Sequence, residues 1–190
     1  MIYEGLIAVV ESHLEQLTET WIQEVKESQY LETYKKLSET ELHSRGNLLF
    51  TNLLDWLLKG ASNDDAANYF TLVGASRIKE GFPLTEIYFA LHLEKRVLWN
   101  YVACKDEVTG ILKPKDAIEF MTVINNYFDL GHFYIMKSYQ AELYKQLVNS
   151  EKFKDYELKE DLIDGALYQE KVKVVKDKMF NEGLTINLVR

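Results

Sequence analysis

Apolar residues recur at intervals of three and four along most of this chain, which is the spacing of one face of an α-helix. The first such stripe predicts a single amphipathic helix from Ile2 to about Ser28. Residues 30–37 are expected to follow as a short helical piece or linker. The apolar members of the stripe are Leu6, Val9, Val10, Leu14, Leu17, Trp21 and Val25.

Two further helices are bounded by residues that favour helix starts. Ser38 stands three residues before a glutamate, which is the capping-box spacing, and predicts a helix that runs to Lys59. The next helix is expected from a cap at Ser62 to about Glu80. A glycine inside a helix costs about 1 kcal/mol relative to alanine, so Gly74 indicates a close crossing with another helix.

A Gly-Phe-Pro turn precedes the next helix. Gly81 is expected to end the preceding helix, and Pro83 to lie in the first turn of the following one. Residues 105–116 are expected to form a loop, and the longest periodic segment runs from there to about Val148, with Gly131 as a candidate bend. The helix after the turn carries Ile87, Tyr88, Ala90, Leu91, Glu94, Val97, Leu98 and Tyr101.

Together these elements predict an all-α protein. We expect an irregular bundle of five to six main helices over residues 1–149, forming one sensor or regulatory domain. The remaining residues, 150–190, are more charged and have a weaker apolar pattern. They are expected to form a C-terminal helical extension or linker.

Composition and charge exclude several classes of function. The net charge of −8 would repel phosphate backbones and anionic membrane surfaces, so we expect no nucleic-acid partner and no membrane contact. No apolar run reaches the roughly 18–20 residues that span a bilayer. The N-terminus lacks the basic region and the cleavage site of a signal peptide. A cytoplasmic location is therefore expected.

The four histidines are His13, His43, His92 and His132. Asp129 and His132 are three residues apart and could face the same way on a helix, but the paired Glu-x-x-His motifs of a di-iron bundle are absent. We therefore predict no metal site. Haem needs only one axial histidine in an aromatic helical pocket, and His92 or His132 could supply it. Because aromatic stripes at helical spacing are mostly core, no cofactor is predicted, and haem stays an alternative.

Motifs for catalysis are lacking. Cys104 lies about 18 Å from His92 along the same predicted helix, so the two cannot form a nucleophile–base pair. The stretch "HLEKR" (92–96) resembles a histidine phosphotransfer helix, but Leu91 and Leu93 flank the histidine where small or polar residues are needed. No phosphate-binding glycine loop, "GxSxG" or "HExxH" occurs. We predict no catalytic residue and a protein that is not an enzyme.

Several short patterns follow one another in an order that resembles a known family. Trp21 lies late in the first helix, "Y-x-x-L-S-x-x-E-L" spans 34–42, and "LLDWL" spans 53–57. The pattern "G-A-S-R-x-x-x-G-F-P-L-T-E-I-x-x-A-L-x-x-x-K-R-x-L-W" then spans 74–99. Over about residues 3–145 the chain resembles the RsbRD-type N-terminal domain. The resemblance implies a helical module that precedes a sulfate-transporter/anti-sigma-antagonist domain in stressosome co-antagonists and a histidine kinase elsewhere.

The resemblance also implies a role in sensing or scaffolding. Related stressosome sensors have globin-like helical folds without haem, so a globin-like arrangement is one alternative for this bundle. The chain departs from the family in one respect, because about forty residues after Asn149 are too few for a kinase or an antagonist domain. We expect either an isolated sensor domain, which includes the case of a piece cut from a longer chain, or a stand-alone adaptor.

The turn at residues 81–83 carries most of the resemblance. Pro83 fixes the start of the following helix, and Phe82 can pack over its first turn. Two arginines are candidates for partly buried ion pairs with a carboxylate such as Glu86 or Glu94. The structural turn and ion-pair candidates are Arg77, Gly81, Phe82, Pro83 and Arg96.

A ligand pocket is the second use that this region could serve. The candidates for its lining are Tyr88, His92, Trp99 and His132, and a filled core is the competing interpretation.

We therefore expect a non-enzymatic signal-transduction sensor or regulatory domain. It would bind a protein partner of a signalling pathway, form a homodimer, and pass a change of packing on through the segment after Asn149. The alternative is a small-molecule or haem-binding sensor with an internal pocket. An enzyme with converging carboxylates and a TetR-like regulator are further alternatives, and the missing basic helix-turn-helix argues against the latter.

Overall fold

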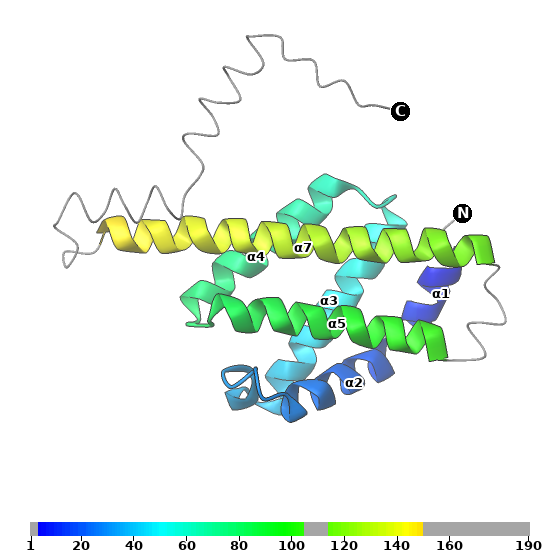
Figure 1. The fold of residues 1–190 in the computed structure, drawn as a ribbon, viewed down its shortest axis with the longest axis horizontal. Coiled ribbons are helices and arrows are strands. Elements are labelled where there is room, and N and C mark those ends of the chain that lie inside the picture. The colour runs from blue at the N-terminus through cyan, green and yellow to red at the C-terminus, as the bar shows by residue number, and fades with distance from the viewer. Residues whose placement is uncertain (1–3, 105–113, 150–190) are drawn as a thin grey trace, which may run out of the picture. The chain divides into compact units, whose positions relative to one another are not determined.

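A computed structural model describes residues 4–104 and 114–149 of the protein (Figure 1). Every regular element within these residues is helical, so the predicted all-α class is confirmed. The elements are α1 (Glu4–Ser12), α2 (Leu14–Glu27), the 3-10 turn η1 (Tyr34–Lys36), α3 (Glu39–Leu58), α4 (Asn63–Lys79), α5 (Leu84–Cys104) and α7 (Pro114–Asn149).

By its internal contacts the chain divides into two compact units, residues 1–139 and 140–190. All contacts described below lie within the first unit. Most of the loop expected over 105–116 lies outside the described residues, as does the extension expected over 150–190. The division into domains 1–149 and 150–190 therefore stays a prediction.

The first helical stripe is broken at His13, where the apolar pattern predicts an unbroken helix. That prediction is wrong, because α1 ends one residue before His13 and α2 begins one residue after it. The backbone of His13 has φ −128° and ψ 19°. Its Nδ1 atom forms a hydrogen bond with the carbonyl oxygen of Val9 at 2.9 Å. The backbone N–H of His13 donates instead to the carbonyl oxygen of Val10 at 3.3 Å. The ring of His13 packs against that of Tyr101 with 4.9 Å between the ring centroids. The histidine ring thus takes over the carbonyl that a continuing helix would use.

The start of α3 confirms the predicted capping box. The backbone N–H of Glu41 donates to the Ser38 hydroxyl at 3.2 Å, and the backbone N–H of Ser38 donates to the Glu41 carboxylate at 2.9 Å. Gly60, with φ of 85°, follows the end of this helix. Ser62 is the N-cap residue of α4, as predicted, but its side chain forms no capping hydrogen bond. Its carbonyl instead accepts the indole N–H of Trp56 at 2.7 Å.

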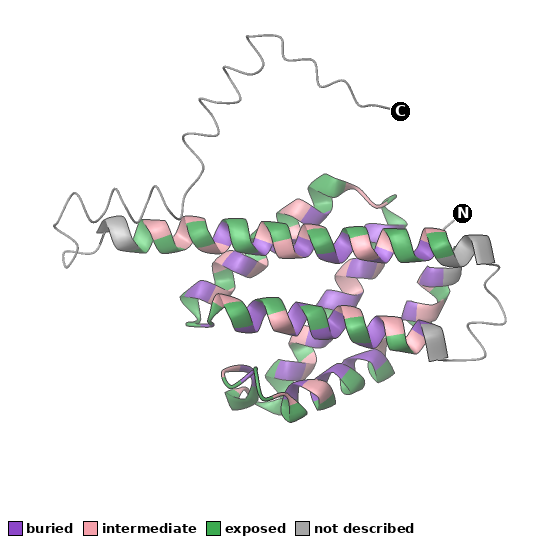
Figure 2. Cartoon of the chain, viewed as in Figure 1, coloured by how far each residue is buried: buried purple, intermediate pink, exposed green. Residues whose placement is uncertain are grey.

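One apolar core joins all the helices of the first unit (Figure 2). Helix α2 packs against α3 and α5, and buried side chains of α4 and α7 complete the cluster. Of the residues expected to fill the core from α5, Ile87, Leu91 and Leu98 are buried and Tyr101 is half-buried. The largest fully buried side chains include Trp21, Phe50, Phe70, Tyr127 and Phe128.

Helix α4 crosses α7 at Gly74, which confirms the close crossing predicted from this glycine. A Cβ atom at Gly74 would lie 2.0 Å from the hydroxyl oxygen of Ser138 and 2.7 Å from the carbonyl oxygen of Ile135. Helix α7 runs unbroken through Gly131, where a Cβ atom would lie 2.8 Å from the ring of Phe70. The two glycines let α4 and α7 approach closely, and this fixes the part of α4 that leads into the candidate site.

Replacing Gly74 with alanine tests this crossing. Alanine normally stabilises a helix interior by about 1 kcal/mol over glycine. Here the added methyl group has no room, so Gly74→Ala should lower the free energy of unfolding by about 1–3 kcal/mol. Urea denaturation followed by circular dichroism measures the change. The double variant Gly74→Ala/Ser138→Ala should recover only part of the loss, because the carbonyl of Ile135 remains in the way. A single variant more stable than the wild type would contradict the crossing.

Candidate functional site

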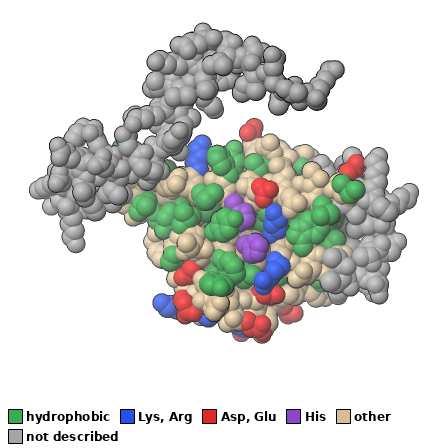
Figure 3. Space-filling model, in the orientation of Figure 1, with side chains coloured by type: hydrophobic (Ala, Val, Ile, Leu, Met, Phe, Trp, Pro, Cys, Tyr) green, Lys and Arg blue, Asp and Glu red, His purple; other side chains and the backbone are tan. Residues whose placement is uncertain are grey.

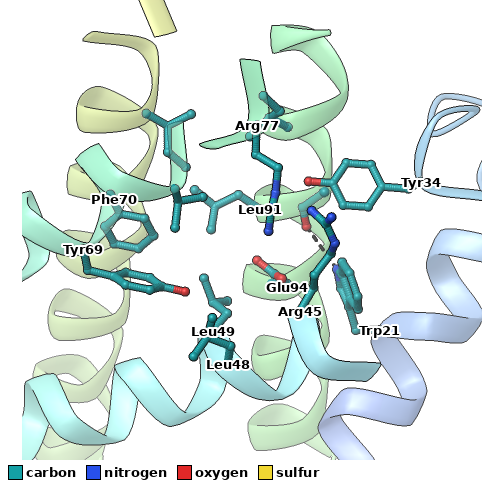
Figure 4. A pocket seen from close by; sticks show the side chains of 14 residues that line it. Trp21, Tyr34, Arg45, Leu48, Leu49, Tyr69, Phe70, Arg77, Leu91 and Glu94 are labelled. Atoms are coloured by element: carbon teal, nitrogen blue, oxygen red, sulfur yellow. Dashed lines mark hydrogen bonds between the residues drawn. The ribbon is translucent and has the colours of Figure 1, made fainter. Parts of the chain in front are cut away.

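A small cavity lies inside the first unit, where α2, η1, α3, α4, α5 and α7 meet (Figure 4). Its volume is about 50 Å³. We call it the Glu94 cavity, and its polar lining residues are Tyr34, Arg45, Tyr69, Arg77 and Glu94. The polar ends of these side chains point toward one another in Figure 4. The remaining lining residues are Trp21, Leu48, Leu49, Phe70, Val73, Ile87, Ala90, Leu91 and Ile135.

Trp21 forms one wall of the Glu94 cavity and joins α2 to α5. Its indole N–H donates to the carbonyl oxygen of Ala90 at 3.2 Å, and the side chain is almost fully buried. Helix α3 can approach because it presents Gly46 to the ring, where a Cβ atom would lie 2.8 Å from Trp21. This close approach brings the neighbouring residue, Arg45, to the cavity.

Tyr34 reaches the cavity from η1, and a buried carboxylate anchors the chain just before it. The backbone N–H and the hydroxyl of Thr33 both donate to Glu86 of α5, at 2.8 and 2.9 Å. Burial raises the pKa of Tyr34 to about 12, although the nearby charge of Arg77 acts in the opposite direction. The phenol is therefore neutral at physiological pH and can donate a hydrogen bond.

Phe82 lies beneath both arginines of the cavity. The turn that places it depends on Gly81, whose φ of 82° is in the left-handed region that favours glycine. The backbone N–H of Phe82 donates to the backbone carbonyl oxygen of Arg77 at 3.0 Å, and the hydroxyl of Tyr139 donates to the carbonyl oxygen of Phe82 at 3.0 Å. The guanidinium carbons of Arg45 and Arg77 lie 5.0 and 5.8 Å from the ring centroid, within the range of cation–π attraction.

Glu80 holds the two guanidinium groups together at the outer side of this cluster. Its carboxylate accepts hydrogen bonds from Arg45 Nη2 at 2.5 Å and Arg77 Nη1 at 2.9 Å, and from the Ser76 hydroxyl at 2.6 Å. Partial burial acts to raise the pKa of Glu80, but the hydrogen bonds from Ser76 and Arg45 and the charge of Arg77 outweigh it, and the pKa is lowered. Glu80 is therefore an ionised partner shared by two cations.

Each arginine also keeps a buried N–H group that has no hydrogen-bond partner among the described residues. These groups are Arg45 Nη1 and Arg77 Nε. Native proteins satisfy most of their buried donors, and an unsatisfied one costs about 1–3 kcal/mol. Both atoms belong to side chains that line the Glu94 cavity, but the atoms themselves are fully buried, so an acceptor in the cavity would reach them only after a small shift of these side chains.

Glu94 is the most deeply buried charge-bearing group of the site. Its side chain comes from α5 and is only 6% exposed. None of the hydrogen bonds or ion pairs found among the described residues involves its carboxyl group, which points into the cavity in Figure 4. Burial raises the pKa of Glu94 well above its usual range, against the opposing charge of Arg77. The protonated carboxyl is thus favoured, and it can both donate and accept a hydrogen bond.

Tyr69 lines the Glu94 cavity and also a second one of about 110 Å³. Burial raises the pKa of Tyr69, and the charge of Glu94 acts in the same direction, so its hydroxyl is also neutral. In the second cavity the hydroxyl of Tyr127 is buried without a partner among the described residues, which suits an ordered water. The second cavity is lined by Asn52, Asp55, Trp56, Lys59, Asp65, Ala66, Tyr69 and Tyr127.

The Glu94 cavity can bind a small polar molecule, since its walls supply several buried hydrogen-bond donors. Within the described residues no three histidine, cysteine, aspartate or glutamate side chains gather as a metal ligand set. In the same part of the chain, no helix combines the length and apolar character needed to cross a membrane.

The arginines singled out from the sequence do form ion pairs, but with other partners than suggested. Arg77 pairs with Glu80, which lies three residues further along the chain. Arg96 pairs with Glu24 of α2 and takes no part in the cavity. Glu86 is engaged by Thr33 instead. The sequence had suggested Glu86 and Glu94 as examples of ion-pair partners for these two arginines.

The turn residues lie close to where the sequence placed them. Gly81 follows the end of α4, and its N–H donates to Ile78 at 3.1 Å. Pro83 lies immediately before α5 rather than inside its first turn, and its carbonyl accepts the N–H groups of Glu86 and Ile87 at 3.0 and 3.2 Å. Phe82 is buried, as a residue packed over the helix start should be.

The four candidates for a pocket lining lie away from both cavities. Tyr88 and His132 stack on each other with 4.2 Å between ring centroids, and Tyr88 is 46% exposed. His92 is exposed beside Phe89, and Trp99 is half-buried. Burial lowers the pKa of His132, whose Nε2 atom has no partner among the described residues. A pocket formed by these four residues stays a prediction.

Sequence reasoning missed Arg45, Tyr34 and Tyr69 as parts of one site. These residues come from three different elements, and only packing brings them together. A signal was present at Glu94, because this acid interrupts the apolar stripe of α5 between Leu91 and Leu98. An acid in a buried stripe needs an explanation, since an isolated buried charge is costly.

Comparison with known proteins bears on residues 15–150. The family model described as "RsbT co-antagonist protein rsbRD N-terminal domain" matches this span. No curated protein matches the chain, and no solved structure does. The matched span includes all five polar residues of the Glu94 cavity.

The raised pKa of Glu94 predicts a specific pH dependence of stability. A carboxyl whose pKa is raised on folding stabilises the folded state below the unfolded pKa of about 4.3, and this contribution is lost as pH rises toward the folded pKa. Glu94→Gln should therefore be more stable than the wild type at pH 7, by a few degrees in Tm. Thermal unfolding of both proteins from pH 4 to pH 8 measures the difference.

The difference between the two proteins should shrink toward pH 4, where the wild-type carboxyl is protonated in the folded state and mostly protonated in the unfolded state. Glu19→Gln, a change at an exposed glutamate of α2, is the matched control and should leave Tm nearly unchanged at every pH. An advantage of Glu94→Gln that does not vary with pH would contradict the raised pKa.

Proposed function

This chain belongs to the family of RsbT co-antagonist rsbRD N-terminal domains, and from this membership we propose that it is a non-enzymatic cytoplasmic signalling domain acting through helix-mediated protein contacts. The family is one of stressosome-related regulatory domains. We further propose that the chain forms a homodimer and engages a protein partner of a signalling pathway. The support comes from an exposed face of the first unit.

The observation that carries this proposal is a mixed aromatic face on α5 and α7. We call it the α5/α7 face and define it by one helical stripe from each helix. Phe133 is 54% exposed, Tyr88 46% and Met136 37%, although all three are largely apolar. Figure 3 shows two histidines in the middle of this view, with hydrophobic side chains on either side. The α5/α7 face consists of Tyr88, His92, Lys95, Asp129, His132, Phe133 and Met136.

Two contacts hold the stripes of the α5/α7 face in register. The ring of Tyr88 stacks on that of His132, and Lys95 donates to the Asp129 carboxylate at 3.1 Å. Because burial lowers the pKa of His132, its ring is neutral at physiological pH. Tyr88 and His132 therefore form an uncharged aromatic pair within the face, and aromatic side chains are enriched in the core of protein interfaces.

A second copy of this chain suits the α5/α7 face. A two-fold dimer requires a patch that is complementary to itself. This face carries the ion pair of Lys95 and Asp129 beside apolar side chains, so two copies could pair opposite charges as well as apolar surface. The segment expected to pass the signal on, residues 150–190, lies outside the described residues.

A second candidate function is that of a small-molecule sensor, which the Glu94 cavity favours. Its volume of about 50 Å³ and the 110 Å³ of the second cavity fall well below the roughly 300–1,000 Å³ of sites for drug-sized ligands. Each of these volumes has room for a ligand of a few atoms. Neither cavity is lined by His92 or His132, so neither supports the haem form of the alternative.

A charge placed in the α5/α7 face tests the proposed function. Phe133→Glu should weaken the homodimer at least 10-fold, because a carboxylate would be desolvated at the interface. Sedimentation equilibrium or light scattering over a range of protein concentrations measures the dissociation constant.

The matched control places the same charge on another exposed apolar residue. Leu72 of α4 is 71% exposed and does not belong to the α5/α7 face, so Leu72→Glu should leave the dimer unchanged. A wild-type protein that stays monomeric at high concentration would count against the homodimer. Equal effects of the two variants would count against the α5/α7 face as the interface.

A further inference from the structure

We propose that the Glu94 cavity binds a small monovalent oxyanion, either a short carboxylate or an inorganic anion of similar size, through buried N–H groups of Arg45 and Arg77. This deepens the proposed signalling function, on which it rests only for its biological meaning, by naming a chemical class of signal.

Two buried N–H groups of arginine side chains are the main donors of the proposed site. Arg45 Nη1 and Arg77 Nε are buried and have no hydrogen-bond partner among the described residues. Another nitrogen of each guanidinium group, Arg45 Nη2 and Arg77 Nη1, already binds the Glu80 carboxylate. The shared carboxylate of Glu80 and the ring of Phe82 fix both guanidinium groups in place. Although burial raises the pKa of the Tyr34 phenol, a hydrogen bond with Arg77 acts to lower it, so an anion would share the Arg77 guanidinium with that phenol and would bring two oxygen atoms for the two buried donors.

The hydroxyl groups of Tyr34 and Tyr69 and the carboxyl group of Glu94 add to these donors. All three side chains line the same cavity, and no hydrogen bond between described residues uses the carboxyl group of Glu94. With the carboxyl protonated, Glu94 can donate to an anion rather than repel it. A neutral acid that donates to bound negative charge is a known use of a raised pKa.

The charge balance of the cluster favours a single negative charge. Arg45 and Arg77 contribute two positive charges, and the ionised Glu80 neutralises one of them. With Glu94 neutral, one positive charge remains unmatched inside the protein. A monovalent anion would cancel it, whereas a divalent anion would leave a buried negative charge.

The size of the cavity sets the size of the ligand. A cavity needs roughly 10–15 Å³ of free volume to hold one water molecule. The free volume of about 50 Å³ in the Glu94 cavity therefore has room for about four non-hydrogen atoms. Formate, acetate, bicarbonate and nitrate are of this size. A larger molecule would have to extend out of the cavity toward the exposed side chain of Leu48.

The position of the ligand would connect it to the surface. Helix α5 carries Glu94 on the side that faces the cavity, and carries Tyr88, His92 and Lys95 on the α5/α7 face. An anion held between α3 and α4 would change the packing partners of Glu94. A ligand can bias the dimer in this way only as far as it binds the two packings with different affinity.

The test is isothermal titration calorimetry of the full chain with sodium formate, acetate, bicarbonate and nitrate, each against sodium chloride at equal ionic strength. For so small a ligand we expect a Kd of about 0.1–10 mM for at least one anion. Binding of the carboxylates alone would assign an organic acid, and binding of bicarbonate or nitrate alone would assign an inorganic anion. Proton–nitrogen spectra should show the Nε–H signal of Arg77 shifting with the same Kd.

Variants separate a binding role from a structural one. Arg77→Gln should weaken binding at least 10-fold, and Arg77→Lys should fail to restore it, since lysine keeps the charge but not the fixed N–H. Arg96→Gln removes an arginine–glutamate pair outside the cavity and is the matched control, with an unchanged Kd. Tyr69→Phe removes a single hydroxyl and should weaken binding about 2- to 10-fold without loss of the fold.

Absence of both binding heat and any shift of the Arg77 signal, for all four anions at ten times the expected range, would overturn the proposal and leave water as the occupant. Equal weakening by Arg77→Gln and Arg96→Gln would overturn it as well. Binding in a protein that never dimerises would support the ligand and count against the proposed function. A dimer that binds no anion would do the reverse.

Discussion

The burial of Glu94 beside two arginines is the constraint around which the first unit is arranged. A carboxyl group that is 6% exposed and has no hydrogen bond among the described residues would be costly as a free charge. Protonation removes most of that cost, and the arginines are steadied from the other side by Glu80 and the ring of Phe82. The polar cluster is therefore compatible with an apolar core only because its charges are shared or neutralised.

Close approaches of backbone put these groups within reach of one another. Gly46 lets α3 lie against Trp21, and Gly74 lets α4 lie against α7. The left-handed turn at Gly81 then brings Phe82 under both guanidinium groups. Each of these three glycines performs a local task, and together they place side chains from separate helices around a single cavity.

Helix α5 connects the interior of the unit with its surface. One side of the helix contributes Ala90, Leu91 and Glu94 to the cavity, and the other contributes Tyr88 and Lys95 to the α5/α7 face. A regulatory domain needs an element whose packing both a ligand and a partner can sense. Under the two proposals α5 would be that element, since its two sides are chemically different.

Much of the fold was determined by the sequence alone, because helical periodicity, the capping box at Ser38 and the glycine at position 74 act over short distances along the chain. The family resemblance was likewise visible in short motifs. What only the tertiary structure decided was how residues far apart in the chain meet. The break at His13 depends on a ring that packs against Tyr101, nearly ninety positions away in the sequence. The partners of Arg45 and Arg77 and the isolation of Glu94 follow from the packing of separate helices, and local periodicity carries no information about those distances.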